Sequence, residues 1–600
     1  MKHFVAPAAA LAGTLAAAFL LAPAEANACG GTFCDGGPQP MPVDQSGENI
    51  LFVRDGDVME AHIQIQYMGN PERFGWVIPM QSAPEFSVGS EPLFQALLAG
   101  SVPSYFTQAT ADDCNFGDGD DGDSPPNGGG DGAGGDSGGD DGGEGGLMTV
   151  TETVGAFEIT VLSGGTAEEV NTWLVDNEYE TDDAALPILA EYLDEGHVFG
   201  AVKLTSGAGV NEIHPIVLRF ESDEPCIPLR LTRIAATDDM DVRTFFLGDD
   251  RVVPKNYRHV LVNPLKIDWL NSATNYKEVI SLAVDAPGAD GRAFVTEYAG
   301  PSNAVSQVGL VNDALDPDAF LDADVVDVID ILEEQGAYVC DFDFGTGCGG
   351  THPLMQPIVS EFIPVPDGVE ADDFYDCLEC YVDDIDQAAW DATAFGAAIR
   401  SRIIMPGMHA QQLLDQNDYL TRMYTTISPH EMMTDPMFHE NPDLDEVVAA
   451  QVGSQRFLCN NDSVYTLPDG REVYLPAGAT WPTFEDEEAW VQPSTEEVQE
   501  VMTSGAPLLL STNTEAIDVA LAAYNAAMGW PGGGEDGGGE GGEGGEGGAD
   551  GGTGGSGGDG GAGVDSDDGG CGCRTTNAPL GMAWTLLFGL GLVNARRRRD

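Results

Sequence analysis

The chain has 600 residues, of which 42% are hydrophobic, and its 100 Asp and Glu residues against 24 Lys and Arg residues give a formal net charge of −76. So negative a chain repels nucleic-acid phosphates and anionic lipid headgroups, which excludes a nucleic-acid-binding protein. Much of the glycine (78 residues) lies in acidic low-complexity tracts, and the remainder is apolar enough to form a sizeable core.

The N-terminus has the pattern of a secretory signal peptide. Lys2 precedes an apolar run from Phe4 to Ala22, and Ala26 and Ala28 place small residues at both positions that determine cleavage. We expect signal peptidase to cut after Ala28 and to leave Cys29 as the first residue. A cysteine there could carry a lipid, but a lipobox usually has Leu where this chain has Ala26, so cleavage without lipidation is the simpler interpretation.

The first part of the mature chain has a strand pattern. Ile50–Val53 is apolar and meets a turn at Asp55-Gly56, after which Ala61–Tyr67 alternates between apolar and polar residues, as a half-buried strand does. These two segments predict a β-hairpin, and Phe74–Ile78 predicts a third strand. His62 lies on the polar side of the second strand, so we expect a solvent-exposed imidazole there.

A tract of Asp and Gly interrupts this region at residues 117–146. It has too few apolar residues to offset the entropy of ordering, so we expect a disordered surface insertion. Its aspartates resemble part of a calcium-binding loop, but the bidentate Glu that closes such a loop is missing. The weak calcium candidates are Asp118, Asp120, Asp121 and Asp123.

Residues 147–303 alternate short strands with two helices. Thr166 and Glu169 form a capping box for a helix through Trp173, and Gly196 is placed to end a second helix that begins near Ala184. Because strands outnumber helices, the pattern favours a largely antiparallel, β-rich α+β domain formed by residues 29–116 and 147–303. The predicted strands are Ala156–Leu162, Val198–Leu204, Ile213–Phe220, Leu229–Ile234, Thr244–Leu247 and His259–Val262.

Residues 304–530 predict a more helical, mixed region that contains disulfides. Helix patterns lie at 325–332 and at Ile517–Met528, and Ser494 with Glu497 forms a second capping box. A β-hairpin is predicted around the turn at Pro468–Gly470.

Nine cysteines precede the C-terminal segment, and in an oxidising envelope most of them should form disulfides. Cys29–Cys34 and Cys340–Cys348 are plausible local pairs. The C-x-x-C motif at Cys377 is interpreted first as a structural disulfide, with half a zinc site or a redox pair as alternatives. The odd number leaves one thiol over, which lipidation of Cys29 or a free cysteine would explain. The disulfide candidates are Cys29, Cys34, Cys114, Cys226, Cys340, Cys348, Cys377, Cys380 and Cys459.

The C-terminal part begins with a Gly/Glu tract at residues 531–570, which we expect to be a disordered, extended spacer. Cys571-Gly572-Cys573-Arg574 follows it, and an apolar run from Pro579 to Val593 comes next. That run is marginal for a bilayer, which needs about 20 residues. The chain then has a basic cluster, expected to stay cytoplasmic, at Arg596, Arg597, Arg598 and Arg599.

The order of these parts in residues 571–600 resembles the MYXO-CTERM sorting signal of myxobacterial surface proteins. The resemblance implies a myxosortase-type protease as a processing partner, a transmembrane helix that is removed, and a lipid on Cys571 or Cys573. A plain membrane anchor is the alternative.

Several stretches of the mature chain resemble a bacterial family known only as domain of unknown function 2330. The resemblance covers about residues 29–438 and implies an exported protein without an established activity, so it transfers no catalytic residues. The matching stretches are Ala28–Cys34, Val43–Glu48 with Ile50, Ala61–Tyr67, Phe74–Pro79 and Tyr419–Pro429.

We find no motif in the sequence that predicts a catalytic or metal-binding residue, and no cofactor is expected apart from weakly held calcium. Gly345, Gly347 and Gly350 satisfy G-x-G-x-x-G, but they lie between cysteines without a following helix pattern. We expect a cell-surface protein of the envelope, whose body is a non-catalytic binding or structural module on an acidic spacer. The alternatives are a carboxylate-based hydrolase and a calcium-dependent adhesin.

Overall fold

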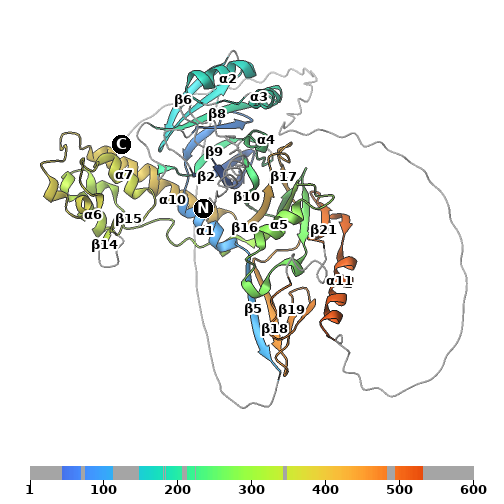
Figure 1. Ribbon diagram of the computed structural model, residues 1–600. Helices are drawn as coiled ribbons and strands as arrows, with labels where there is room; N and C mark the ends of the chain where they lie inside the picture. Colours follow the sequence, from blue (N-terminus) through green and yellow to red (C-terminus); the bar gives the residue numbers. More distant parts are fainter. Residues whose placement is uncertain are drawn as a thin grey trace, which may run out of the picture.

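The computed structural model describes residues 44–68, 75–112, 147–179, 181–182, 184–205, 212–222, 224–234, 236–341, 347–482 and 493–530 (Figure 1). The strands are β1 (Asp44–Asp55), β2 (Val58–Met68), β3 (Gly75–Met80), β4 (Glu85–Val88), β5 (Ser104–Ala111), β6 (Met148–Val154), β7 (Phe157–Ser163), β8 (Val198–Leu204), β9 (Ile216–Glu221), β10 (Ala236–Gly248), β11 (Val252–Pro254), β12 (Arg258–Val262), β13 (Ala293–Pro301), β14 (Tyr338–Asp341), β15 (Gly347–Gly350), β16 (Tyr419–Ile427), β17 (Phe438–Glu440), β18 (Ala450–Phe457), β19 (Ser463–Thr466), β20 (Glu472–Leu475), β21 (Thr495–Glu500) and β22 (Leu508–Thr512). The helices are α1 (Glu91–Ser101), α2 (Ala167–Asp176), α3 (Ala185–Asp194), α4 (Leu229–Thr232), α5 (Tyr276–Val284), α6 (Val328–Glu334), α7 (Met355–Phe362), α8 (Ala371–Asp376), α9 (Ala392–Ile399), α10 (Met405–Gln416) and α11 (Thr514–Ala527).

A ten-stranded mixed sheet organises the fold, with strand order β22-β21-β12-β13-β16-β10-β1-β2-β9-β4. Most neighbours are antiparallel, whereas β1 pairs with β10 and β12 with β13 in parallel. Strands from both sides of residue 303 lie in this sheet, because β16, β21 and β22 join strands of the earlier region. The sheet therefore joins the predicted β-rich domain, residues 29–116 and 147–303, to the predicted more helical region, residues 304–530.

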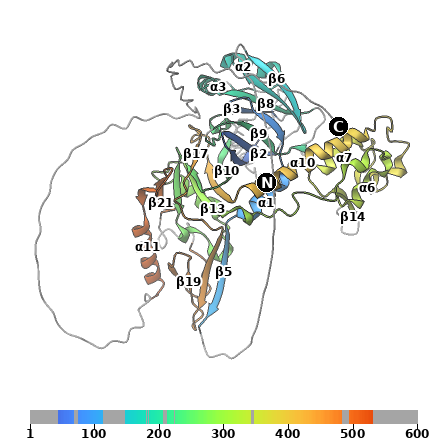
Figure 2. The same cartoon turned by 180° about the vertical axis from the view of Figure 1, so that it is seen from behind.

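At its centre, the large sheet is one of four stacked layers. One face packs on the four-stranded sheet β3-β8-β7-β6, where Ile50 and Phe52 of β1 meet Trp76 and Ile78 of β3. Helices α2 and α3 cover the far side of that second sheet. On its opposite face, the large sheet packs through Leu51 and other residues against α1 and α10. Figures 1 and 2 show α1 and α10 side by side against the sheet.

The helical region, which carries α6 to α9 and the short β14–β15 hairpin, has its own apolar core. It projects to one side of the large sheet in both views (Figures 1 and 2). A third unit combines β5, β18, β19 and β20 in a four-stranded sheet, and a core with Trp269 and Trp481 packs this unit on α11. The fold is thus α+β, with a β-rich first part and a more helical, disulfide-containing later part.

One helical segment leads from the helical region to the large sheet. It runs from α9 through a π-helical turn at Arg400–Ile404 into α10. Pro406 lies near the start of α10 and lacks the N–H that an ordinary helical turn needs, which accounts for a widened turn at this point. At Gly407 a Cβ atom would come within 2.2 Å of the Leu310 carbonyl oxygen, so only glycine allows this close packing.

Most elements predicted from periodicity and capping are confirmed. The hairpin of β1 and β2, the capping box of α2 at Thr166, the end of α3 near Gly196 and the β19–β20 hairpin all form. Confirmed boundaries include β8, which coincides with the predicted Val198–Leu204.

Two local predictions are wrong. Leu229–Ile234 is not a strand, because Leu229–Thr232 forms the short helix α4; the buried Asp435 carboxylate accepts hydrogen bonds from the Arg230 backbone N–H and Nε, each at 2.9 Å. The apparent capping box at Ser494 and Glu497 is also not a helix start, because Thr495–Glu500 is strand β21 between β12 and β22. In both cases a tertiary contact overrides a local sequence signal.

The low-complexity tracts at residues 117–146 and 531–570 and the segment 571–600 lie outside the described residues, as does the signal peptide. Within the described part of the chain, every helix is too short or too polar to span a bilayer.

Candidate functional site

The residues with the clearest potential for chemistry lie where α10 crosses β2. Glu60 and His62 are two positions apart in β2 and therefore point to the same face of the sheet, the one opposite the apolar Met59, Ala61 and Ile63. His409 comes from α10, which covers this face. Strand alternation and helix packing thus bring together three side chains separated by up to 349 positions in the sequence.

The geometry of this cluster, here called the Glu60–His62–His409 cluster, centres on one carboxylate oxygen. Glu60 Oε1 lies 2.6 Å from His62 Nε2 and 2.5 Å from His409 Nε2. The two imidazole rings stack with centroids 5.8 Å apart. Glu60 and His62 are buried, while the His409 side chain is 37% exposed, so the cluster has one edge open to solvent.

The charge on Glu60 is stabilised despite burial. Burial alone would raise the pKa of its carboxyl group, but the hydrogen bonds from His409 and His62 and the attraction of both rings lower that pKa well below the usual range. The expectation that His62 is a surface imidazole is wrong, because only 1% of the residue is exposed. The polar face of β2 is covered by α10, which strand alternation alone does not reveal.

A second row of polar side chains adjoins the cluster. Asn49 Nδ2 donates to Gln64 Oε1 at 2.7 Å, and Gln64 Nε2 donates to both carboxylate oxygens of Glu91, each at 2.7 Å. Glu91 belongs to α1, so this row ties the helix to the sheet. Two buried atoms, His62 Nδ1 and Asn49 Oδ1, have no hydrogen-bond partner among the described residues.

A cavity of about 270 Å³ lies on the other face of the large sheet. Its apolar lining includes Phe52, Phe246 and Phe438, and its polar lining includes Glu224 and Glu440. A smaller hollow of about 50 Å³ shares Phe52 and Glu224 with it and lies between the large sheet and β3. Concave, largely apolar sites with a few polar groups are where small ligands commonly bind.

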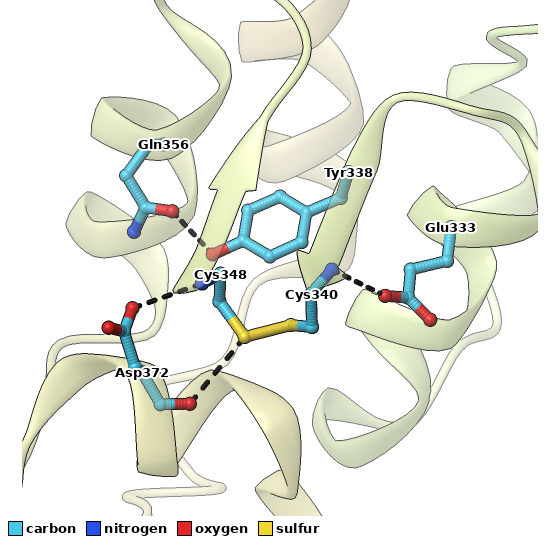
Figure 3. The surroundings of a disulfide bond; sticks show 6 residues. All are labelled: Glu333, Tyr338, Cys340, Cys348, Gln356 and Asp372. Atoms are coloured by element: carbon cyan, nitrogen blue, oxygen red, sulfur yellow. Dashed lines mark hydrogen bonds between the residues drawn. A yellow bond between two sulfur atoms is a disulfide. The ribbon is translucent and has the colours of Figure 1, made fainter. Parts of the chain in front are cut away.

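The cysteines of the described residues are all in disulfide bonds. Cys340 pairs with Cys348 across the β14–β15 hairpin, as predicted (Figure 3). Cys377 pairs with Cys380. Cys226 and Cys459 are disulfide-bonded too. Because the sulfurs of the C-x-x-C motif are joined, neither is available as a zinc ligand, which supports the structural interpretation of that motif over a half zinc site.

Hydrogen bonds hold the chain on both sides of the first disulfide. Glu333 accepts from the Cys340 N–H at 3.1 Å, Asp372 accepts from the Cys348 N–H at 3.0 Å, and Tyr338 donates to Gln356 (Figure 3). These hydrogen bonds join the disulfide-linked hairpin to α6 through Glu333 and to α8 through Asp372.

The remaining predicted site residues lie outside the described residues. These are the calcium candidates Asp118, Asp120, Asp121 and Asp123, the processing residues Ala28, Cys29, Cys571, Cys573, Arg596, Arg597, Arg598 and Arg599, and the cysteines Cys34 and Cys114. Sequence reasoning missed Glu60 and His409 altogether. The available signal was Glu60-x-His62 on one face of a strand, but it gains meaning only with its distant partner.

Comparisons with known proteins give a family and no activity. None of the curated proteins compared with the chain matches it. Two crystal structures of a mutated baculovirus P35 after caspase cleavage are each 10% identical to the chain. The alignment with the first covers 36% of this chain and 76% of the P35 chain, with a TM-score of 0.21. The alignment with the second covers 39% of this chain and 82% of the P35 chain, with a TM-score of 0.20. Residues 23–439 match the family described as "Uncharacterized protein conserved in bacteria (DUF2330)". The chain therefore belongs to this bacterial family.

Proposed function

We propose that the protein is exported to the cell envelope and held at the cell surface by its C-terminal segment, where the folded body binds a ligand without catalysing a reaction. The observation that carries the proposal is the oxidised state of every described cysteine. Disulfides persist in exported proteins and are rare in the reducing cytosol. The signal-peptide pattern and the C-terminal sorting pattern support the same location.

The cavity on the large sheet supports a binding role for the body. Its aromatic lining from β1, β10 and β17 favours an apolar ligand or an apolar part of a larger one. The carboxylates at its edge, together with the chain's net charge of −76, favour a neutral or cationic ligand over an anion. Purified mature chain should thus be retained by isolated envelope material; a chain that passes through unretained would contradict the binding role.

We expect the native protein from envelope fractions to have a mass that starts at Cys29 and ends near Cys571 or Cys573 with a lipid-sized increment. Reduction should add two hydrogen atoms for each disulfide, with a contribution from Cys340–Cys348 and from Cys377–Cys380. Intact-mass measurement with and without reductant checks both points. A mass that still includes Arg596 to Arg599 would mean that the tail is a plain membrane anchor.

A carboxylate-based hydrolase is a second candidate, because two carboxylates line the same cavity. Burial raises the pKa of Glu440, and the negative charges of Asp250 and Asp249 raise it further. The positive charge of Arg54 lowers this pKa but does not cancel the rise. Glu224 instead forms an ion pair with Lys255 at 2.6 Å. Carboxyl groups in contrasting environments are typical of acid and base pairs in glycoside hydrolysis.

This candidate predicts that a panel of chromogenic glycosides contains a substrate, and that Glu440→Gln lowers the turnover of that substrate about 100-fold or more by removing an acid catalyst. Glu361→Gln is a matched control, since Glu361 lies on the surface in an ion pair with Arg402. Absence of hydrolysis across the panel, or equal loss in both variants, would exclude this role for Glu440.

A further inference from the structure

The Glu60–His62–His409 cluster contains a set of possible metal ligands that no sequence motif predicts. Two imidazoles and one carboxylate are the protein ligands of many catalytic zinc sites and of the facial triads that hold non-haem iron. Each residue offers one ligand atom, and these atoms lie within 4.8 Å of one another. We propose that this cluster is a binding site for one divalent transition-metal ion, with Zn²⁺ as its first candidate, held by Glu60 Oε1, His62 Nε2 and His409 Nε2.

Metal binding requires only a small expansion of the observed geometry. Zinc bonds of about 2.0–2.2 Å in a tetrahedral arrangement separate neighbouring ligand atoms by roughly 3.3 Å. Glu60 Oε1 is now 2.6 Å and 2.5 Å from the two Nε2 atoms. Each of these two distances therefore has to widen by under about 1 Å, which requires a small rotation of the Glu60 carboxylate away from His62 as well as a movement of His409 at the solvent edge.

Two unpartnered buried atoms beside the cluster, His62 Nδ1 and Asn49 Oδ1, are compatible with the same ion. In the observed contact His62 Nε2 directs its proton to Glu60, while neither His62 Nδ1 nor Asn49 Oδ1 has a hydrogen-bond partner among the described residues. A metal bound at Nε2 moves the ring proton to Nδ1 and turns His62 into a donor at that atom.

The register of the sheet places an acceptor for that proton nearby. Asn49 of β1 lies opposite Gln64, and Leu51 lies opposite His62, so Asn49 occupies the diagonal position to His62 on the same face. Diagonal neighbours are within reach of long side chains. The Asn49 carboxamide, itself held by Gln64, is thus placed to orient the ligand ring, as second-layer acceptors do at metal sites.

Two further features fit a site of this kind. Because the His409 side chain is 37% exposed, an ion can enter from solvent and a water molecule can complete its coordination. His409 also follows the π-helical turn at Arg400–Ile404, and such turns occur often at functional sites. The buried negative charge of Glu60 balances half of the charge of a divalent ion.

The test is titration of the purified full chain with Co²⁺, followed by displacement with Zn²⁺. Co²⁺ bound to nitrogen and oxygen ligands at low coordination number gives visible absorption bands, whereas Co²⁺ held diffusely by acidic tracts keeps the weak spectrum of the hydrated ion. We expect one equivalent of Co²⁺ per chain to give these bands and Zn²⁺ to abolish them. A wild-type spectrum that stays that of the hydrated ion overturns the proposal.

Substitutions at the exposed ligand separate metal binding from folding. His409→Gln should weaken Co²⁺ binding by about 100-fold or more, since loss of a direct ligand exceeds the effect of losing a second-layer partner. His409→Cys should retain binding and add a near-ultraviolet sulfur-to-cobalt charge-transfer band. His430→Gln is the matched control, because the His430 side chain is 79% exposed and lies outside the cluster. Equal affinity in wild type and His409→Gln, or a bound His409→Cys variant without the band, contradicts the assignment.

Discussion

Glu297→Gln is expected to destabilise the folded body by about 3–5 kcal/mol, because it leaves a buried arginine without its counter-charge. Arg422 Nε lies 2.5 Å from Glu297 Oε2, and only 3% and 5% of these residues are exposed. Glutamine retains the size of Glu297 and can still accept the hydrogen bond that Tyr276 donates at 2.8 Å. The loss thus reports the missing charge and not a cavity.

The arginine also fixes α1 on the large sheet. Its Nη1 atom donates to the Leu98 carbonyl oxygen at 3.3 Å and to Ser101 Oγ at 3.4 Å, both on α1. Arg422 lies on β16 and Glu297 on β13, so the pair joins two strands and a helix. An unpaired Arg422 would therefore loosen the layer that also holds Glu91 against Gln64.

Urea unfolding of wild type and variants measures this effect. Arg400→Met is the matched control: Arg400 and Asp318 are 2.8 Å apart but exposed by 51% and 69%, so its loss should cost under about 1 kcal/mol. The double variant Glu297→Gln/Arg422→Met should recover part of the loss, because no charge is then left unpaired. A cost for Glu297→Gln as small as that for Arg400→Met would mean that water reaches the pair.

Local signals in the sequence predict much of the first half of the fold. The β1–β2 hairpin, the capped helix α2 and strand β8 follow from alternation, a capping box and a glycine after a helix, which are properties of neighbouring residues. The order of strands in the large sheet does not follow, because β10 lies between β1 and β16 through contacts about 190 and about 180 positions apart along the chain.

The candidate site shows the same division. His62 is apparent in the sequence, but its burial depends on α10, which carries His409 and covers this face of β2 from a distant part of the chain. The sequence of β2 alone predicts an exposed imidazole at His62, because it does not reveal that α10 covers this face of the strand. Cysteine pairing is predictable where the loop is short, as for Cys340 and Cys348. The family resemblance is confirmed, and it carries no chemistry with it.

Acid is expected to destabilise the body through two buried histidines that must stay neutral. His214 Nδ1 donates to the Pro215 carbonyl oxygen at 2.8 Å, and its Nε2 accepts from the Ala156 N–H at 3.2 Å. In His259, Nδ1 donates to Gln499 Oε1 at 3.1 Å, and Nε2 accepts from the Thr296 hydroxyl at 2.9 Å. A second ring proton would therefore face a donor in the first case and displace an accepted bond in the second.

The pH window follows from the direction of the shifts. Burial lowers the pKa of His214 to about 4, with a further contribution from the positive charge of Arg402. Burial and the positive charge of Arg251 lower the pKa of His259 to about 4 as well. An unfolded histidine titrates near 6.5, so the unfolded chain takes up protons first as the pH falls. The stability is fully present above about pH 6.5 and is lost as the pH falls from there towards 4.

Each histidine should remove about 2 kcal/mol of stability between pH 7.5 and pH 5, so the two together remove about 4 kcal/mol, a large part of the total stability of a typical domain. The measurement is the urea unfolding free energy at these two pH values for wild type and for His214→Gln/His259→Gln. Glutamine cannot titrate, so the variant, although less stable at pH 7.5, should lose about 4 kcal/mol less on acidification. His430→Gln removes an exposed ring and should leave the wild-type pH slope unchanged. Parallel pH slopes for wild type and the double variant would show that both rings have the same pKa in the folded and the unfolded chain, so that burial does not keep them neutral.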